Sequence, residues 1–270
     1  MQDSLANPVN PTVLVFDSGL GGLTVLREIA GLRRDLKLVY AADDAVFPYG
    51  RLDDDALIAR VSSVMDGLIV RFAPALVVIA CNTASTLTLP VLRAQHAIPF
   101  VGTVPAVKPA CAQSKTKRIS VLATPGTVKR DYTRTLIAEF AGDCRVDLAG
   151  SERLAPLAEA YLRGEAVTDA EIAKEIAPAF VDDGAKTDTV VLACTHYPLL
   201  LARLKQLAPW PVVWVDPAPA IARRVASLLP VPGVPVREPV QAHFTSGKIP
   251  GPALSKSLRS FGIEPAGEAV

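Results

Sequence analysis

The chain has 270 residues, of which half are hydrophobic and a fifth are charged, and its formal net charge is +1. A chain of this size and composition can bury a large core, which describes an ordinary soluble globular protein. Its basic residues are spread along the chain, so we expect small-molecule partners and no nucleic acid. No apolar stretch is long enough to span a bilayer without interruption by charge, Gly or Pro, so we expect no membrane contact.

The predicted strands are short runs rich in Val, Ile and Leu, separated by longer stretches of helical period. In chain order they are Val13–Phe16, Leu38–Ala41, Leu76–Ala80, Phe100–Val101, Ile119–Ala123, Val190–Ala193 and Val212–Val215. The tail adds a strand near Ala242–Phe244 and a helix near Pro250–Phe261. This alternation predicts an α/β fold, in which helices cover both faces of parallel sheets.

The clearest predicted helix begins after Asp53–Asp55, whose negative charges favour a helix N-terminus. Its apolar face comprises Leu57, Val61, Val64, Leu68 and Phe72. The segment from Met1 to Pro11 is polar and interrupted by proline, so we expect no secretory signal and a cytoplasmic protein. Four cysteines at wide, irregular spacing fit neither a disulfide framework nor zinc knuckles, and their thiols are expected to be free.

One segment of the chain occurs twice: Val77-Val78-Ile79-Ala80-Cys81-Asn82-Thr83 reappears as Val190-Val191-Leu192-Ala193-Cys194-Thr195-His196. A weaker repeat follows at nearly the same offset: Pro99-Phe100-Val101 and Pro105-Ala106 are answered by Pro211-Val212-Val213 and Pro217-Ala218. The pattern predicts two similar lobes related by a pseudo-twofold axis, with the active site in the cleft between them. We assign 11–104 and the returning tail 216–270 to the first lobe, and 105–215 to the second.

Each repeat ends a predicted strand with a cysteine, Cys81 or Cys194. Ligands of open parallel sheets bind beyond the carboxyl ends of the strands, so the two thiols are expected to share one cleft. The helix that follows each cysteine favours a thiolate and predicts a pKa below about 8.5. Inversion of an amino acid at its α-carbon needs a base on one face and an acid on the other, which two opposed thiols provide.

Polar residues accompany both cysteines. Asp17 opens the Gly-rich turn Asp17–Gly22, whose N–H groups can hold an anion, and it either caps the next helix or serves the first thiol. Thr83 and Thr195 are either helix caps or donors to a ligand carboxylate. His196 is placed to steer or accept a proton beside the second thiol, whereas the other histidines, His96 and His243, are read as structural.

The chain resembles the bacterial glutamate racemases of the aspartate/glutamate racemase superfamily, and the resemblance covers nearly its whole length. Six segments in order carry it: Phe16–Val25, Pro48–Gly50, Ala80–Ser85, Gly102–Ala106, Ala123–Val128 and Cys194–Pro198. The resemblance implies a cofactor-independent enzyme that interconverts L- and D-glutamate, supplies D-glutamate for peptidoglycan synthesis and forms a homodimer.

The resemblance also implies roles for individual residues. Cys81 and Cys194 would be the two proton donor/acceptors, assisted by Asp17 and His196 respectively. The substrate contacts that it implies are Asp17, Ser18, Pro48, Tyr49, Gly50, Asn82, Thr83, Thr195 and His196. Two positions depart from the family pattern: Ala193 replaces a glycine, and Arg130 replaces a small residue and either faces solvent or alters the lobe interface.

Other readings remain open at this point. Aspartate racemases, hydantoin racemases and malonate decarboxylases share the framework. Asp17, Cys81, Cys194 and His196 could instead supply four ligands to zinc. A redox protein lacks support because no Cys-x-x-Cys pair occurs. A regulatory role towards DNA gyrase, which the family resemblance raises, lacks a basic patch for direct DNA contact.

Overall fold

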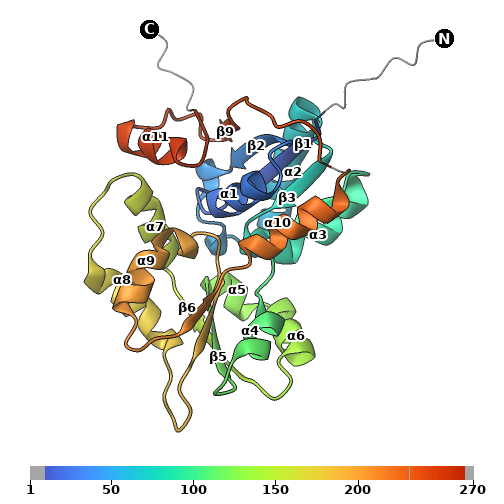
Figure 1. Ribbon diagram of the computed structural model, residues 1–270. Coiled ribbons are helices and arrows are strands. Elements are labelled where there is room, and N and C mark those ends of the chain that lie inside the picture. Colours follow the sequence, from blue (N-terminus) through green and yellow to red (C-terminus); the bar gives the residue numbers. More distant parts are fainter. Residues whose placement is uncertain (1–9, 231, 265–270) are drawn as a thin grey trace, which may run out of the picture.

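The structure is a computed structural model that describes residues 10–230 and 232–264. Two lobes lie one above the other in Figure 1, each built around a parallel sheet. Most of the segment for which we expected no secretory signal, residues 1–9, lies outside the described residues. Among the helices of the described ranges, none combines the length and the apolarity needed to cross a membrane.

The first lobe contains a five-stranded sheet with the order β4-β3-β1-β2-β9, in which all neighbours are parallel. Its strands are β1 (Thr12–Asp17), β2 (Lys37–Ala42), β3 (Leu76–Ile79), β4 (Phe100–Gly102) and β9 (Gln241–Phe244). Alternate side chains of β1 face opposite sides: Val13 and Val15 join one core, and Leu14 and Phe16 the other. Burial on both faces explains why β1 is a continuous apolar run.

Helices cover both faces of this sheet. One core is shared by α1 (Leu23–Leu32), α10 (Ala218–Leu228) and α11 (Pro252–Arg259), and the other by α2 (Asp54–Phe72) and α3 (Asn82–Gln95). Helix α2 begins at Asp54, within the acidic run after which it was expected, because the carboxylate of Asp53 accepts a hydrogen bond from the Ala56 N–H at 2.8 Å.

The second lobe contains a four-stranded parallel sheet with the order β6-β5-β7-β8. Its strands are β5 (Arg118–Ala123), β6 (Arg145–Gly150), β7 (Thr189–Ala193) and β8 (Val213–Val215). One face packs on α4 (Val107–Gln113) and α6 (Asp131–Phe140), and the other on α7 (Leu154–Leu162), α8 (Asp169–Ile176) and α9 (Leu201–Leu207). The short helix α5 (Pro125–Lys129) joins β5 to α6.

The two sheets share one topology. Numbered in chain order within its lobe, each sheet has the strand order 4-3-1-2, and β9 is added at the edge of the first. This agreement supports the internal repeat seen in the sequence. In such a sheet the order in which strands are added reverses between the first and third strands, and ligands bind at the carboxyl ends of the strands at this point. Cys81 follows β3 and Cys194 follows β7, so both thiols lie at this point of their lobe.

The predicted fold class is confirmed, and all eight predicted strands occur, with ends that shift by at most one residue. Strand β6 was missed. It is an edge strand in which Arg145 and Asp147 alternate with apolar residues, so it lacks the continuous apolar run of a buried strand. The tail contributes β9, which pairs with β2, and α11, which lies close to the predicted bounds. The exact division into domains stays a prediction.

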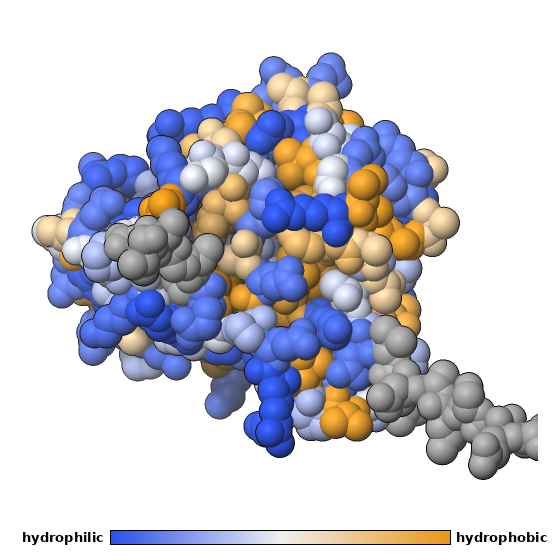
Figure 2. All heavy atoms as spheres, turned by 90° about the horizontal axis from the view of Figure 1, so that it is seen from above, coloured by the Kyte–Doolittle hydropathy of each residue, from blue (hydrophilic) through white to orange (hydrophobic). Residues whose placement is uncertain are grey.

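The outer face of the first lobe has an ordinary mixed surface. Viewed from above that lobe, hydrophobic residues reach the surface in patches between hydrophilic ones (Figure 2). Most protein surfaces have this composition, because there is too little polar surface to cover a globule. The hydrophobic core itself consists of four buried clusters, two in each lobe.

Candidate active site

One small cavity between the lobes is lined by both cysteines. Its volume is about 20 Å³, which is room for about one water molecule. The predicted residues that line it are Ser18, Pro48, Tyr49, Gly50, Cys81, Asn82, Thr83, Cys194, Thr195 and His196. Phe47, Thr124 and Ala155, which the sequence did not single out, complete the lining. The cavity has to widen before a larger ligand can enter.

The first thiol, Cys81, occupies the N-cap position of α3. Its Sγ lies 3.7 Å from the Ser18 hydroxyl, which in turn donates to Asp17 Oδ1 at 3.2 Å. Burial and the charge of Asp17 raise the pKa of Cys81 to about 12, although Ser18 and the Ala84 N–H act in the opposite direction. The lowered pKa expected from the helix start is therefore wrong for Cys81, because desolvation outweighs the helix. This group is a neutral thiol at pH 7.

Asp17 joins the lobes instead of capping a helix. The residue is fully buried; its Oδ1 accepts from the Gly19 N–H at 3.1 Å and its Oδ2 from the Thr195 hydroxyl at 2.8 Å. The N-cap of α1 is Gly22, so the capping alternative is wrong for Asp17. Burial raises the pKa of Asp17, although the charge of His196 and these hydrogen bonds lower it. The Thr195 hydroxyl is thus engaged in a hydrogen bond between the lobes.

The second thiol faces a histidine. Cys194 Sγ lies 3.8 Å from His196 Nδ1, and His196 Nε2 lies 3.0 Å from Glu159 Oε1. Burial alone would lower the pKa of His196, but the hydrogen bonds to Cys194 and Glu159 raise it well above its usual value. A raised pKa favours the protonated ring, whose two N–H groups would then face the Cys194 sulfur and Glu159. The Gly21 N–H also lies 3.2 Å from Nε2.

Glu159 is a site residue that the sequence analysis missed. It lies in α7 and is 5% exposed, so it is a buried carboxylate among apolar neighbours. Burial alone would raise its pKa, but the hydrogen bond and charge of His196, the Leu20 N–H and Arg163 together lower it. Its only sequence signal is a glutamate on the apolar side of a helix, which does not reveal a partner 37 residues away.

The Gly-rich turn after β1 binds this carboxylate. The Leu20 N–H donates to Glu159 Oε1 at 2.6 Å. The sequence predicted that this turn can hold an anion, and the anion that it contacts is a carboxylate of the second lobe. Gly21 must be a glycine here, because a Cβ would lie 2.5 Å from both His196 Nδ1 and Thr195 Oγ1.

We expect Gly21→Ala to lower the free energy of unfolding by about 1–3 kcal/mol, since the added methyl group must displace His196 or Thr195. Urea denaturation followed by circular dichroism measures this. Gly31→Ala is the matched control: its Cβ would meet open space within α1, and alanine should stabilise that helix by roughly 0.5–1 kcal/mol. Equal effects of the two substitutions would contradict the close packing at Gly21.

The loop that carries Pro48, Tyr49 and Gly50 is held by Asp43, which is fully buried at the end of β2. Asp43 accepts hydrogen bonds from the Tyr49 hydroxyl at 2.5 Å, from Arg60 at 2.6 and 2.8 Å, and from the Thr245 hydroxyl at 2.5 Å. Burial alone would raise the pKa of Asp43, but Arg60, Thr245 and Tyr49 lower it. The returning tail thus helps to fix a wall of the cavity.

Removing Arg60 tests this network. A carboxylate with a lowered pKa contributes stability above its unfolded pKa of about 3.9, and that stability is lost as the pH falls through the folded value. We expect Arg60→Ala to raise the pKa of Asp43, so that acid unfolding begins at a higher pH, with a loss of about 1–3 kcal/mol at neutral pH. Acid titration by circular dichroism measures both, with Arg51→Ala, an exposed arginine of the same loop, as the control. An unchanged acid midpoint in Arg60→Ala would rule out the network.

Hydrogen-bond donors for a ligand carboxylate lie beside Cys81. Within the described residues, both polar atoms of the Asn82 side chain are buried without a hydrogen-bond partner. The first N–H groups of α3 also lack partners inside the helix, as at any helix start. Thr83 lies inside α3, so the capping alternative is wrong for it; its hydroxyl is 3.2 Å from Thr124 Oγ1. A bound carboxylate would therefore meet Asn82 and the start of α3.

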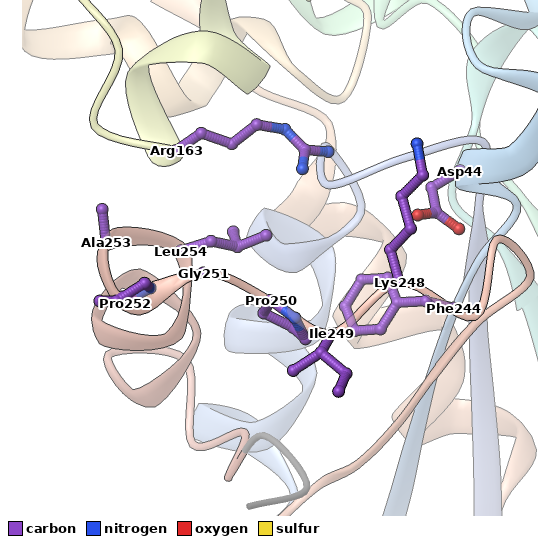
Figure 3. Close-up of a pocket in the computed structure, with 10 residues that line it drawn as sticks. All are labelled: Asp44, Arg163, Phe244, Lys248, Ile249, Pro250, Gly251, Pro252, Ala253 and Leu254. Atoms are coloured by element: carbon purple, nitrogen blue, oxygen red, sulfur yellow. The ribbon is translucent and has the colours of Figure 1, made fainter. Parts of the chain in front are cut away.

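A second pocket, of about 270 Å³, lies between the end of α7 and the loop before α11 (Figure 3). Arg163 reaches over it from α7, opposite Lys248 and Phe244. None of the predicted site residues lines this pocket. Arg163 Nη2 donates to Glu159 Oε2 at 2.9 Å, and Glu159 in turn contacts His196 of the active-site cavity.

The zinc alternative requires the acidic, thiol and imidazole side chains to converge on one point. In the parts of the chain that the structure describes, 10–230 and 232–264, no three or more His, Cys, Asp or Glu side chains are grouped so that they could hold a metal ion. The contacts of Asp17, Cys81 and His196 are instead hydrogen bonds to Thr195, Ser18 and Glu159.

Two α/β lobes of the same topology thus each contribute one thiol to a shared cavity. The chain belongs to the Asp/Glu/Hydantoin racemase family, whose model matches residues 38–225. A glutamate racemase of Mesorhizobium japonicum is 54% identical over 255 residues, which are 93% of this chain and 97% of that protein. A glutamate racemase of Sinorhizobium medicae is 53% identical over 258 residues, 94% of this chain and 95% of that protein.

Solved structures agree with this family. The crystal structure of Escherichia coli glutamate racemase, in complex with L-glutamate and the activator UDP-MurNAc-Ala, matches with a TM-score of 0.87 and 41% identity. The match covers 95% of this chain and 97% of that one. The glutamate racemase of Aquifex pyrophilus matches with a TM-score of 0.70 and 30% identity, over 95% of this chain and 96% of that one.

Proposed function

We propose that this chain is a glutamate racemase that interconverts L- and D-glutamate with Cys81 and Cys194 as its two proton-transferring groups. The observation that carries the proposal is the shared cavity, to which each lobe contributes one thiol at the equivalent strand end. The family membership and the relatives named glutamate racemase support glutamate as the substrate.

In the proposed reaction, the α-carbon of glutamate lies between the two sulfur atoms. One thiolate removes the α-proton, and the opposite thiol donates a proton to the other face of the planar intermediate. In the arrangement described here, Cys81 is the neutral donor, while His196 places a positive charge beside Cys194. The roles are exchanged for the other enantiomer. Because one thiol takes up a proton and the other supplies one, the proton transfers need no further group.

The remaining site residues bind the substrate and stabilise developing negative charge. Asn82 and the first N–H groups of α3 are donors that a carboxylate can use, and fixed donors of this kind lower the barrier to a carbanion. Asp17 and His196 assist the first and second thiol, Asp17 through Ser18 and His196 directly. The other proposed contacts are Pro48, Tyr49, Gly50, Thr83 and Thr195.

D-Glutamate made by the chain would feed peptidoglycan synthesis in the cytoplasm, and the enzyme would act as a homodimer. The support for these statements is the sequence resemblance. Sedimentation of the purified protein with and without glutamate tests the homodimer.

The decisive experiment incubates the purified protein with L-glutamate in heavy water without pyridoxal phosphate. NMR follows loss of the α-proton, and circular dichroism follows optical activity. We expect the α-proton to exchange while the optical signal decays to zero. Racemisation of aspartate but not glutamate would overturn the substrate, and failure with both amino acids would overturn the proposed function.

A further inference from the structure

Arg130, one of the two residues that depart from the family pattern, crosses the lobe interface. It lies between α5 and α6 of the second lobe, and its side chain is 10% exposed. Its Nη1 donates to the Thr83 carbonyl at 2.6 Å and to the Thr86 hydroxyl at 3.1 Å. Its Nη2 lies 3.2 Å from Asp54 Oδ1. One guanidinium therefore binds the starts of α3 and α2 from the opposite lobe.

The position of these contacts matters because α3 begins at Asn82, directly after Cys81. The Thr83 carbonyl belongs to the first turn of this helix, and both Asn82 and Thr83 line the cavity. A planar guanidinium can bind several acceptors in a fixed geometry, whereas the compact ammonium of a lysine acts as a point charge. Arg130 thus fixes the distance of this turn from the second lobe.

A groove on the same side supports a role at the opening of the cavity. It has a volume of about 530 Å³ and is lined by Gly50, Gly126, Lys129 and Arg130 among others. Gly50 lines both this groove and the active-site cavity. Arg130 lies where the lobes must part if a ligand enters from the groove.

We propose that Arg130 is a positioning residue, which fixes the turn that carries Cys81 and Asn82 against the second lobe, and hence relative to Cys194, during proton transfer. This inference rests on the proposed function. The transition state needs both sulfur atoms at the α-carbon at once, whereas binding of glutamate tolerates a slightly wider cleft. A displacement of about 1 Å can cost 10²-fold in rate. Loss of Arg130 should therefore affect kcat more than KM.

Three variants test the role of Arg130. We expect Arg130→Ala to lower kcat at least about tenfold and to change KM less than about threefold. Arg130→Lys should recover part of kcat, because an ammonium can reach the Thr83 carbonyl without binding all the acceptors. Lys129→Ala removes the same charge from the same groove and is the matched control, with expected wild-type kinetics. The midpoint of thermal unfolding is measured for each variant.

The outcomes separate positioning from other roles. Equal losses of kcat in Arg130→Ala and Lys129→Ala would show a general effect of the positive charge and would overturn the positioning role. Wild-type kcat in Arg130→Ala, or a loss of kcat that follows a fall in thermal midpoint across all variants, would overturn the inference. A larger deuterium isotope effect on kcat with α-deuterated glutamate in Arg130→Ala supports it, because proton transfer then limits the rate more strongly.

Hydrogen exchange tests the positioning without any assay of activity. We expect amides of residues 82–87 to exchange faster in Arg130→Ala than in Lys129→Ala, and equal exchange would overturn the inference. If the wild-type protein racemises glutamate while Arg130→Ala behaves as Lys129→Ala, only the inference about Arg130 fails. If the wild-type protein leaves glutamate unchanged, the proposed function fails, and the exchange comparison still decides whether Arg130 orders the start of α3.

Discussion

Replacement of either Cys81 or Cys194 by serine is expected to lower kcat/KM for racemisation by roughly 10²–10⁴-fold, the usual contribution of a positioned acid or base. A serine hydroxyl in place of either thiol is far less acidic, so it cannot serve as base on its face of the substrate. Both variants should remain folded, because serine is close to cysteine in size. The rates are measured by circular dichroism from each enantiomer separately.

Exchange of the α-proton separates the two thiols. In heavy water, each serine variant should still exchange the α-proton of one enantiomer without inversion, since the remaining thiol removes and returns a proton on its own face. The two variants should exchange opposite enantiomers. Cys111→Ser is the matched control, because Cys111 is a buried thiol of α4 and does not line the cavity. Full racemisation by either Cys81→Ser or Cys194→Ser would contradict the two-base mechanism.

Those parts of the site that adjoin strand ends could be predicted from sequence. Cys81 and Cys194 end apolar runs of a kind that forms buried parallel strands, and such strand ends gather at one edge of a sheet. The repeat then predicted that the two edges share a cleft. Local patterns were sufficient because each of these residues is placed by its own strand and the helix that follows.

Contacts between distant segments could not be predicted in this way. Glu159 reaches His196 and the Leu20 N–H only because the lobes are packed together, and nothing in the local sequence of α7 records this. The pKa of Cys81 was predicted in the wrong direction for the same reason. The helix start is local and visible in the sequence, whereas full burial beside Asp17 depends on the tertiary structure.

Glu159→Gln should lower kcat/KM about 10- to 100-fold, since it removes a charged hydrogen-bond partner of His196. The amide retains the size of the carboxylate but neither its charge nor its preference for a cationic ring. His196 would then be a weaker cation beside Cys194. Glu165→Gln, an exposed change of the same kind near the end of α7, is the control and should leave kcat/KM unchanged.

The pH dependence of Glu159→Gln follows from the raised pKa of His196. A group with a raised folded pKa contributes stability that is complete below its unfolded value of about 6.5 and is lost as the pH rises through the folded value. Without the Glu159 carboxylate the folded pKa falls, so the contribution is smaller and its loss is complete at a lower pH. The alkaline limb of kcat/KM is expected to move to lower pH with it. An alkaline limb that stays in place would show that Glu159 does not hold the charge of His196.

NMR titration of the histidine rings measures this charge directly. The chain has three histidines, and His243 is expected to titrate below the usual value because burial and the nearby charge of Arg71 lower its pKa. His196 should remain protonated through neutral pH in the wild-type protein and should titrate at a lower pH in Glu159→Gln. Because the ring contacts both Cys194 and Glu159, a shift at His196 with His243 unchanged would place the effect at the second thiol. A His196 ring that is neutral at pH 7 in the wild-type protein would contradict a positive charge beside Cys194. His196 would then act as a neutral hydrogen-bond donor.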